Sequence, residues 1–75
     1  MIFLLTYDRS NGVLVKELQF KDSEIEVANE ARLEAEIACA GNGQMEVVIL
    51  KAESREKLQE THARYFKTLK QLSPT

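Results

Sequence analysis

Two short segments of this chain are apolar on both sides, which restricts the folds that it can adopt. Successive side chains of an extended strand point to opposite faces, so residues 2–7 and 45–50 each carry two apolar sets. The opposed sets are Phe3, Leu5 and Tyr7 against Ile2 and Leu4, and Met45, Val47 and Ile49 against Val48 and Leu50. Burial of each large aliphatic side chain contributes roughly 1.5–3 kcal/mol, so we expect both segments to be covered strands.

The residues between and after these strands predict one α+β domain, residues 1–75. Asn11-Gly12 suits a tight hairpin turn, so residues 13–20 are expected to return antiparallel to the first strand. Residues 21–41 and 55–72 have helical periodicity, which makes the order β-β-α-β-α. With the most apolar strand in the centre, we expect a three-stranded, mainly antiparallel sheet of order 2-1-3. Both helices are expected on one face of it, as a two-layer sandwich.

The second strand and the first helix have different polarity patterns. Residues 13–20 are half polar, as an edge strand should be, with Leu14, Leu18 and Phe20 expected on one face and Lys16 between them. The first helix has a stripe of small side chains and should therefore lie close to the sheet. Leu33 and Ile37 fall off that stripe. The stripe consists of Val27, Ala28, Ala31, Ala35, Ala38 and Cys39.

Two helices on one side would leave the other face of the sheet bare and apolar. A second copy of the chain, stacked sheet on sheet or helix edge on helix edge, would cover that face. The alternative is that Met45 and Lys51 shield it within one chain. We therefore predict a homodimer, with another protein as a further partner.

Composition excludes several classes of protein. The net charge is -2, which disfavours binding to nucleic acid through the overall field. One cysteine cannot form an internal disulfide, and no paired spacing resembles a zinc site. The apolar run of residues 2–5 is too short for a signal peptide or a membrane span. We expect a cytoplasmic protein with no cofactor, no metal and no membrane partner.

The single histidine, His62, is the main candidate for catalysis. Helical spacing from Leu58 to Leu72 places it on an apolar stripe, where its ring can pack while one nitrogen finds an acceptor. As a general base it would need Cys39 as nucleophile, or Asp8 as an orienting carboxylate. No motif supports either pair. We therefore expect no catalytic residue, and a partly buried structural role for His62.

Three short segments carry a resemblance: TYDRSNG near the start, EVVILKAES, and THARYF towards the end. With these residues, the chain resembles a group of short uncharacterised bacterial proteins to which no activity is assigned. The resemblance implies a bacterial origin and transfers no site. If the hairpin mouth approaches the last helix, a polar cluster could form, and a small ligand could bind there. Its members would be Asp8, Arg9, His62, Arg64 and Tyr65.

A basic edge of the last helix is the remaining candidate surface. Basic side chains interleaved with aromatic rings can hold a nucleic-acid backbone and stack bases. The candidate contacts are Lys57, Arg64, Lys67 and Lys70, next to Tyr65 and Phe66. Glu56 and Glu60 lie in the same patch and weaken it. The leading hypothesis is a non-enzymatic, self-associating protein-interaction module, with nucleic-acid binding as the rival and a small-ligand binder as the third alternative.

Overall fold

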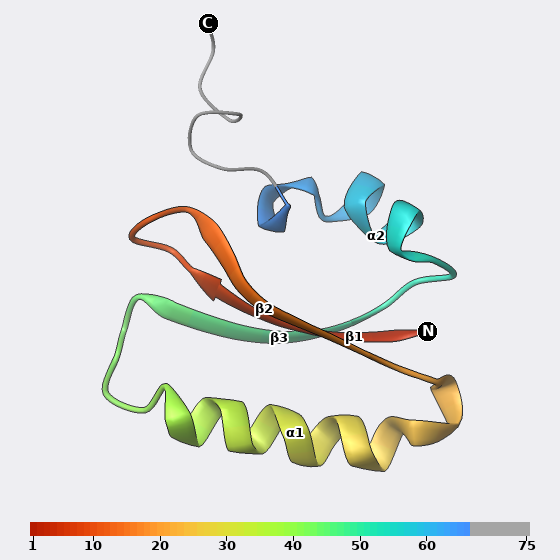
Figure 1. The fold of residues 1–75 in the computed structure, drawn as a ribbon, viewed down its shortest axis with the longest axis horizontal. Coiled ribbons are helices and arrows are strands. Elements are labelled where there is room, and N and C mark those ends of the chain that lie inside the picture. The colour runs from red at the N-terminus through yellow and green to blue at the C-terminus, as the bar shows by residue number, and fades with distance from the viewer. Residues whose placement is uncertain (67–75) are drawn as a thin grey trace, which may run out of the picture.

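The computed structural model describes residues 1–66, and its sheet has the predicted strand order. The central strand pairs antiparallel with both neighbours, in the order β2-β1-β3 (Figure 1). A small α+β fold with this sheet is therefore confirmed. The elements are β1 Ile2–Asp8, β2 Val13–Phe20, the 3-10 turn η1 Asp22–Glu24, α1 Ile25–Ala38, β3 Met45–Lys51, α2 Arg55–Thr61 and the 3-10 turn η2 Ala63–Tyr65.

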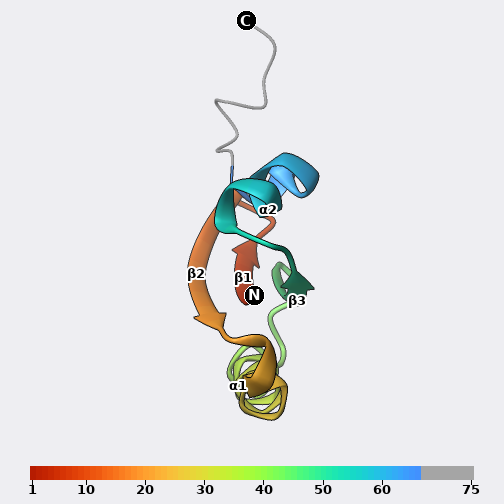
Figure 2. The ribbon, with the colours of Figure 1, turned by 90° about the vertical axis from the view of Figure 1, so that its right-hand side faces the viewer.

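The two helices lie on opposite faces of the sheet, so the prediction of a two-layer sandwich with both helices on one face is wrong (Figures 1 and 2). Residues 2–7 of β1 are all buried, and one helix layer could cover only half of them. The short segment of residues 52–54 leads the chain across to the second face. The expected bare apolar face is therefore absent from the described residues.

The face under α2 has the larger continuous core. Its buried members are Phe3, Leu5 and Tyr7 from β1, with Leu58 from α2 and Tyr65 from η2. Side chains of β2 and β3 extend it at both sides, namely Leu14, Val48 and Leu50. The opposite face of β1 carries Ile2, Leu4 and Thr6, and α1 packs there against β1 and β3.

The hairpin loop, residues 9–12, is held by the carboxylate of Asp8. Asp8 Oδ1 accepts hydrogen bonds from the Ser10 N–H at 2.9 Å and the Ser10 hydroxyl at 2.7 Å, and Oδ2 accepts from Asn11 Nδ2 at 2.7 Å. The loop closes where the Gly12 N–H donates to the Asp8 carbonyl at 2.8 Å. Gly12 has a φ of 68°, a conformation that glycine adopts without a steric penalty. The turn expected at Asn11-Gly12 thus has its left-handed residue at Gly12.

A β-bulge divides β2 into two halves, and the side-chain alternation is reversed between them. The pairing with β1 shifts between Thr6 and Tyr7, whose partners are Lys16 and Leu14, so Val15 is the extra residue. Val15 is 57% exposed. Because of the bulge, Leu14 packs in the core beneath α2, whereas Leu18 faces α1. Our expectation that these two leucines share a face is wrong, because a bulge reverses the alternation beyond it.

The small-residue stripe of α1 faces the sheet only in part. Ala28 is fully buried and Ala31 and Ala35 are half-buried, but Val27 and Ala38 are exposed. Leu33 and Ile37 lie on the outer side, 55% and 70% exposed. These two are the uncovered side chains that the periodicity predicted. Gly41 follows the helix with a φ of 85°, as expected for a left-handed C-terminal residue.

The last helix is much shorter than the predicted 55–72. The Ser54 hydroxyl accepts a hydrogen bond from the Lys57 N–H at 3.2 Å and caps α2, which ends at Thr61. His62 leaves the helical conformation, with φ -128° and ψ 47°. Leu69 and Leu72 lie outside the described residues. None of the helices within residues 1–66 has the length and apolarity that a bilayer crossing requires.

Candidate functional site

A polar cluster that joins distant parts of the chain lies where η2 meets the first half of β3. Glu46 accepts a hydrogen bond from the Tyr65 hydroxyl at 2.6 Å through Oε2, and one from Arg64 Nη2 at 2.9 Å through Oε1. The ring of Tyr65 meets that of Tyr7 edge to face, with centroids 5.2 Å apart. The Arg64 guanidinium lies over the Tyr65 ring, 4.6 Å from its centroid. One carboxylate therefore holds two side chains of η2 on the sheet.

The electrostatics of this cluster favour a fixed arrangement. Burial raises the pKa of Tyr65 above its ordinary value, and the hydrogen bond to Glu46 raises the pKa further. The phenol is therefore kept in its neutral, donating form. Both oxygens of Glu46 are occupied, and Arg64 balances its charge. Because both oxygens of this carboxylate already accept hydrogen bonds, it links η2 to β3 and has no oxygen free for general acid or base catalysis.

The structure brings together only part of the predicted polar cluster. Arg64 and Tyr65 meet on Glu46, whereas Asp8 is bonded within its own loop. Arg9 turns to the loop before β3, where Nη2 donates to the Gly43 carbonyl at 2.6 Å and the N–H donates to the Gln44 carbonyl at 2.8 Å. Among the described residues, no hydrogen bond or ion pair joins Asp8 or Arg9 to His62 or Arg64.

His62 is half-buried and caps α2 through its backbone. Its N–H donates to the Leu58 carbonyl at 2.8 Å, and its own carbonyl accepts from the Tyr65 N–H at 3.2 Å. The ring lies 6.4 Å from that of Tyr65, and its nitrogens have no hydrogen-bond partner within residues 1–66. Cys39, the nucleophile that His62 would need, follows α1 on the opposite face of the sheet. A structural role for the His62 side chain stays a prediction, because the bonds that cap α2 are made by its backbone.

The two described cations of the predicted basic edge are each paired with an acid. Lys57 Nζ lies 3.5 Å from Glu60, and Arg64 lies 2.9 Å from Glu46. Because α2 ends at Thr61, Lys57 and Arg64 also belong to different elements. Lys67 and Lys70 lie outside the described residues. Nucleic-acid binding through this edge stays a prediction, and the described geometry adds no support to it.

Sequence reasoning missed Glu46, the residue that organises the cluster. The available signal was its position, a single acid at the start of an otherwise apolar strand. Alternation places Glu46 on the same face as Val48 and Leu50, where a charge needs a partner. The partners could not be found from periodicity, because Arg64 and Tyr65 lie 18 and 19 residues away, in a 3-10 turn that follows the end of α2.

Comparison with known proteins adds no further restriction. No family model, curated protein or solved structure matches this chain. The resemblance to short uncharacterised bacterial proteins therefore stays a prediction. Within residues 1–66, no three His, Cys, Asp or Glu side chains gather in a way that could hold a metal ion.

Proposed function

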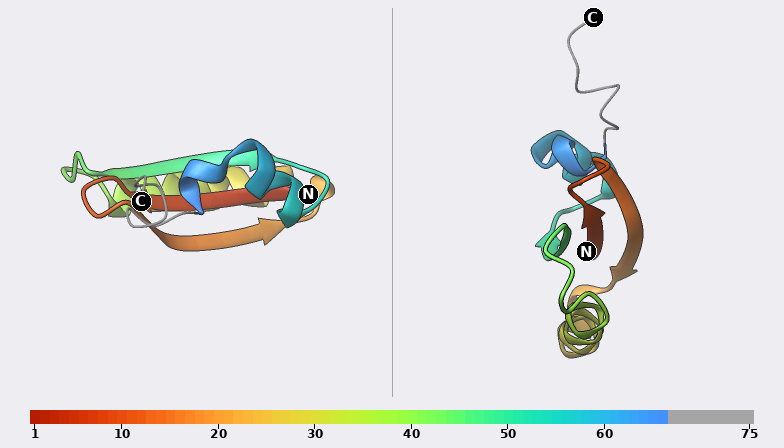
Figure 3. Two further views of the ribbon diagram at one scale, coloured as in Figure 1. Left: turned by 90° about the horizontal axis from the view of Figure 1, so that it is seen from above. Right: turned by 90° about the vertical axis from the view of Figure 1, so that its left-hand side faces the viewer.

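We propose that this chain is a small non-enzymatic protein-interaction module whose first partner is a second copy of itself, joined along β3. The observation that supports this proposal is the difference between the two edges of the sheet (Figure 3). β2 carries a bulge at Val15 and charged residues at Lys16 and Glu17. These are devices that prevent edge-to-edge pairing. β3 carries neither between Val47 and Leu50.

The backbone of β3 has hydrogen-bonding groups directed away from the sheet. Its register with β1 is regular, and its ends are marked by two bonds: Ala52 N–H to the Met1 carbonyl at 3.1 Å and Arg9 N–H to the Gln44 carbonyl at 2.8 Å. In an antiparallel ladder, alternate residues bond to the same neighbour. The even-numbered residues of β3 therefore bond to β1, and Val47 and Ile49 direct their N–H and C=O groups outwards.

These outward groups are self-complementary under two-fold symmetry. If two β3 strands pair antiparallel about Val48, Val47 of one copy lies opposite Ile49 of the other, and each pair exchanges two hydrogen bonds. The two sheets then become one, and each helix layer continues beside its counterpart. Within residues 1–66 no other segment covers the outer side of β3 (Figures 2 and 3). This arrangement replaces the sheet-on-sheet stacking expected from the sequence.

We also keep the bacterial cytoplasm as the proposed setting. The support is the sequence resemblance and the single thiol of Cys39, which has no second cysteine in the chain to pair with.

Sedimentation equilibrium tests the assembly, with one backbone variant and one matched control. The chain has a mass of 8.5 kDa, and we expect about twice that mass at micromolar concentration. Val47→Pro removes one outward N–H without removing a bond to β1, so it should sediment as a folded monomer. Val47→Ala shortens the same side chain but keeps the N–H, so it should remain a dimer.

Two results would contradict the proposal. One is a monomer for the unsubstituted chain at every concentration tested. The other is a dimer that survives Val47→Pro with its dissociation constant unchanged. Intermolecular NMR contacts between Val47 and Ile49 of isotopically distinct copies would test the register directly.

A further inference from the structure

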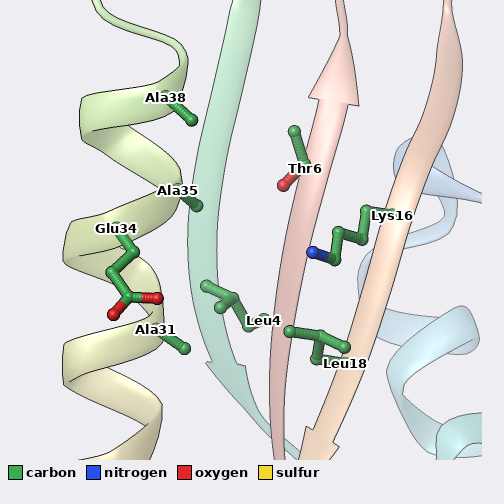
Figure 4. Close-up of a pocket in the computed structure, with 8 residues that line it drawn as sticks. All are labelled: Leu4, Thr6, Lys16, Leu18, Ala31, Glu34, Ala35 and Ala38. Carbon is green, nitrogen blue, oxygen red and sulfur yellow. The ribbon is translucent and has the colours of Figure 1, made fainter.

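The face covered by α1 contains a cleft that the helix does not fill. α1 packs against β1 and β3, and the inner face of β2 is left beside an open space (Figure 4). This space has a volume of about 260 Å³. Leu4 and Leu18 line it from the sheet, and Ala31 and Ala35 line it from the helix. Because the helix side chains here are single methyl groups, they leave room that larger ones would occupy.

The hydroxyl group of a largely buried threonine, Thr6, lines this cleft. Thr6 is only 8% exposed as a residue, but its hydroxyl oxygen still reaches the open space, and no described residue within 1–66 forms a hydrogen bond with it. Thr6 lines the cleft from the middle of β1, on the side of α1 (Figure 4). A group bound in the cleft would supply the partner that the protein does not.

Two opposite charges flank the same space. Lys16 lines it from β2, with its amine directed towards β1, and Glu34 lines it from α1, with its side chain lying along the helix (Figure 4). They are too far apart to form an ion pair with each other, and neither is paired with any other described residue. A purely anionic ligand would meet Glu34, and a purely cationic one would meet Lys16. A molecule that carries both charges can pair with Lys16 and with Glu34.

We propose that the cleft binds a small zwitterion with an aliphatic body, of the class of the aliphatic amino acids. Its carboxylate accepts hydrogen bonds from Lys16 Nζ and the Thr6 hydroxyl, and its ammonium group binds Glu34. The aliphatic part packs on Leu4 and Leu18. A volume near the lower limit of small-molecule pockets suits a ligand of this size. The cleft is lined by no residue of β3, so its occupancy does not depend on the proposed dimer.

NMR titration of the full chain with L-leucine tests this proposal. We expect saturable shifts of the backbone amides of Thr6, Lys16 and Ala35. Two matched probes carry one charge each: 4-methylpentanoate has the carboxylate only and 3-methylbutylamine has the ammonium only. Each should bind at least about tenfold more weakly than leucine, since each leaves one charged wall without a partner.

Variants of the two exposed charges keep the test independent of folding. Lys16→Met should weaken leucine about tenfold and leave 3-methylbutylamine unchanged, and Glu34→Gln should weaken leucine and leave 4-methylpentanoate unchanged. Lys57→Met, which removes a lysine far from the cleft, is the control and should bind leucine normally. The proposal is overturned if leucine produces no saturable shifts, if a single-charge probe binds as well as leucine, or if both cleft variants bind leucine as the unsubstituted chain does.

Discussion

The two faces of the sheet are built on different principles. Under α2, large side chains interlock, and named polar pairs hold the covering segment: Tyr65 on Glu46, and Arg55 on Glu17 at 2.9 Å. On the other face, the longer helix α1 packs on the sheet through its own small side chains and leaves a cleft beside β2. A seven-residue helix can be retained only by specific contacts, because short helices are marginal in water. A fourteen-residue helix can tolerate a looser fit, and the looser face has room for a ligand.

The largest effect is expected from the interlocked face. Leu58 is fully buried and is the main apolar contact of α2 with the sheet. Leu58→Ala should lower the free energy of unfolding by about 2–5 kcal/mol, since it leaves a cavity that the surroundings cannot close. The measurement is a urea titration at one fixed protein concentration. Leu33→Ala, on the exposed side of α1, is the control and should change stability by less than about 0.5 kcal/mol. Equal losses of unfolding free energy in Leu58→Ala and Leu33→Ala would contradict the difference between the two faces.

The second prediction compares two alanines of the same α1 stripe. Ala28 is fully buried against the sheet, whereas Ala35 borders the cleft. Ala28→Leu should therefore cost about 1–3 kcal/mol through overpacking. Ala35→Leu should cost less, because its added carbons can extend into the cleft. Thermal melts of both variants provide the comparison. If Ala35→Leu melts at or below the temperature of Ala28→Leu, the cleft is not the free space that we describe.

The third prediction concerns the tie between η2 and β3. Tyr65→Phe removes the hydrogen bond to Glu46 and keeps the ring packing on Tyr7, so it should cost about 1 kcal/mol. Tyr7→Phe is the matched control, because the Tyr7 hydroxyl has no hydrogen-bond partner within residues 1–66. It should be nearly neutral in the same urea titration. A larger loss for Tyr7→Phe would reverse our assignment of the polar tie.

Tyr65 also predicts how stability depends on alkaline pH. Its folded-state pKa is raised above the ordinary value of 10.0 by burial and by the bond to Glu46. The unfolded chain therefore loses this proton first as the pH rises. The stabilising contribution is fully present below about pH 10 and is lost as the pH rises through the folded-state pKa. Tyr65→Phe should lack this part of the alkaline decline, and Tyr7→Phe should retain it.

The smallest effect is expected in the hairpin loop, outside both faces. Hydrogen bonds from the Ser10 and Asn11 side chains hold the pKa of Asp8 below its ordinary value of 3.8. A lowered folded-state pKa contributes stability above the unfolded value, and this contribution is lost as the pH falls below it. Asp8→Asn keeps an oxygen acceptor but no titrating proton, so its stability should fall less steeply below pH 3.8. Ser10→Ala should raise the pKa of Asp8, measured by NMR. An unchanged pKa would show that the loop bonds do not hold the carboxylate.

Part of the candidate site could be anticipated, and part could not. Arg64 and Tyr65 both belong to the predicted cluster, which is drawn from the segments that carry the resemblance. Their common partner Glu46 lies 18 and 19 residues away, beyond any local pattern. Thr6 and Lys16 were passed over for a related reason. A threonine in a buried strand and a lysine in an edge strand are ordinary residues until a cleft is found between them.

Local patterns determined the elements and the sheet. The two-sided apolar runs placed β1 in the centre, and the turn residues at Asn11-Gly12 produced the hairpin and the order β2-β1-β3. Only the tertiary structure decided on which face each helix lies, where β2 changes its facing and where the last helix ends. Periodicity depends on residues that are close together in the sequence, whereas the burial of each sheet face depends on which distant segments pack against it. Since every residue from 2 to 7 of β1 becomes buried, the sheet needs a helix on each face.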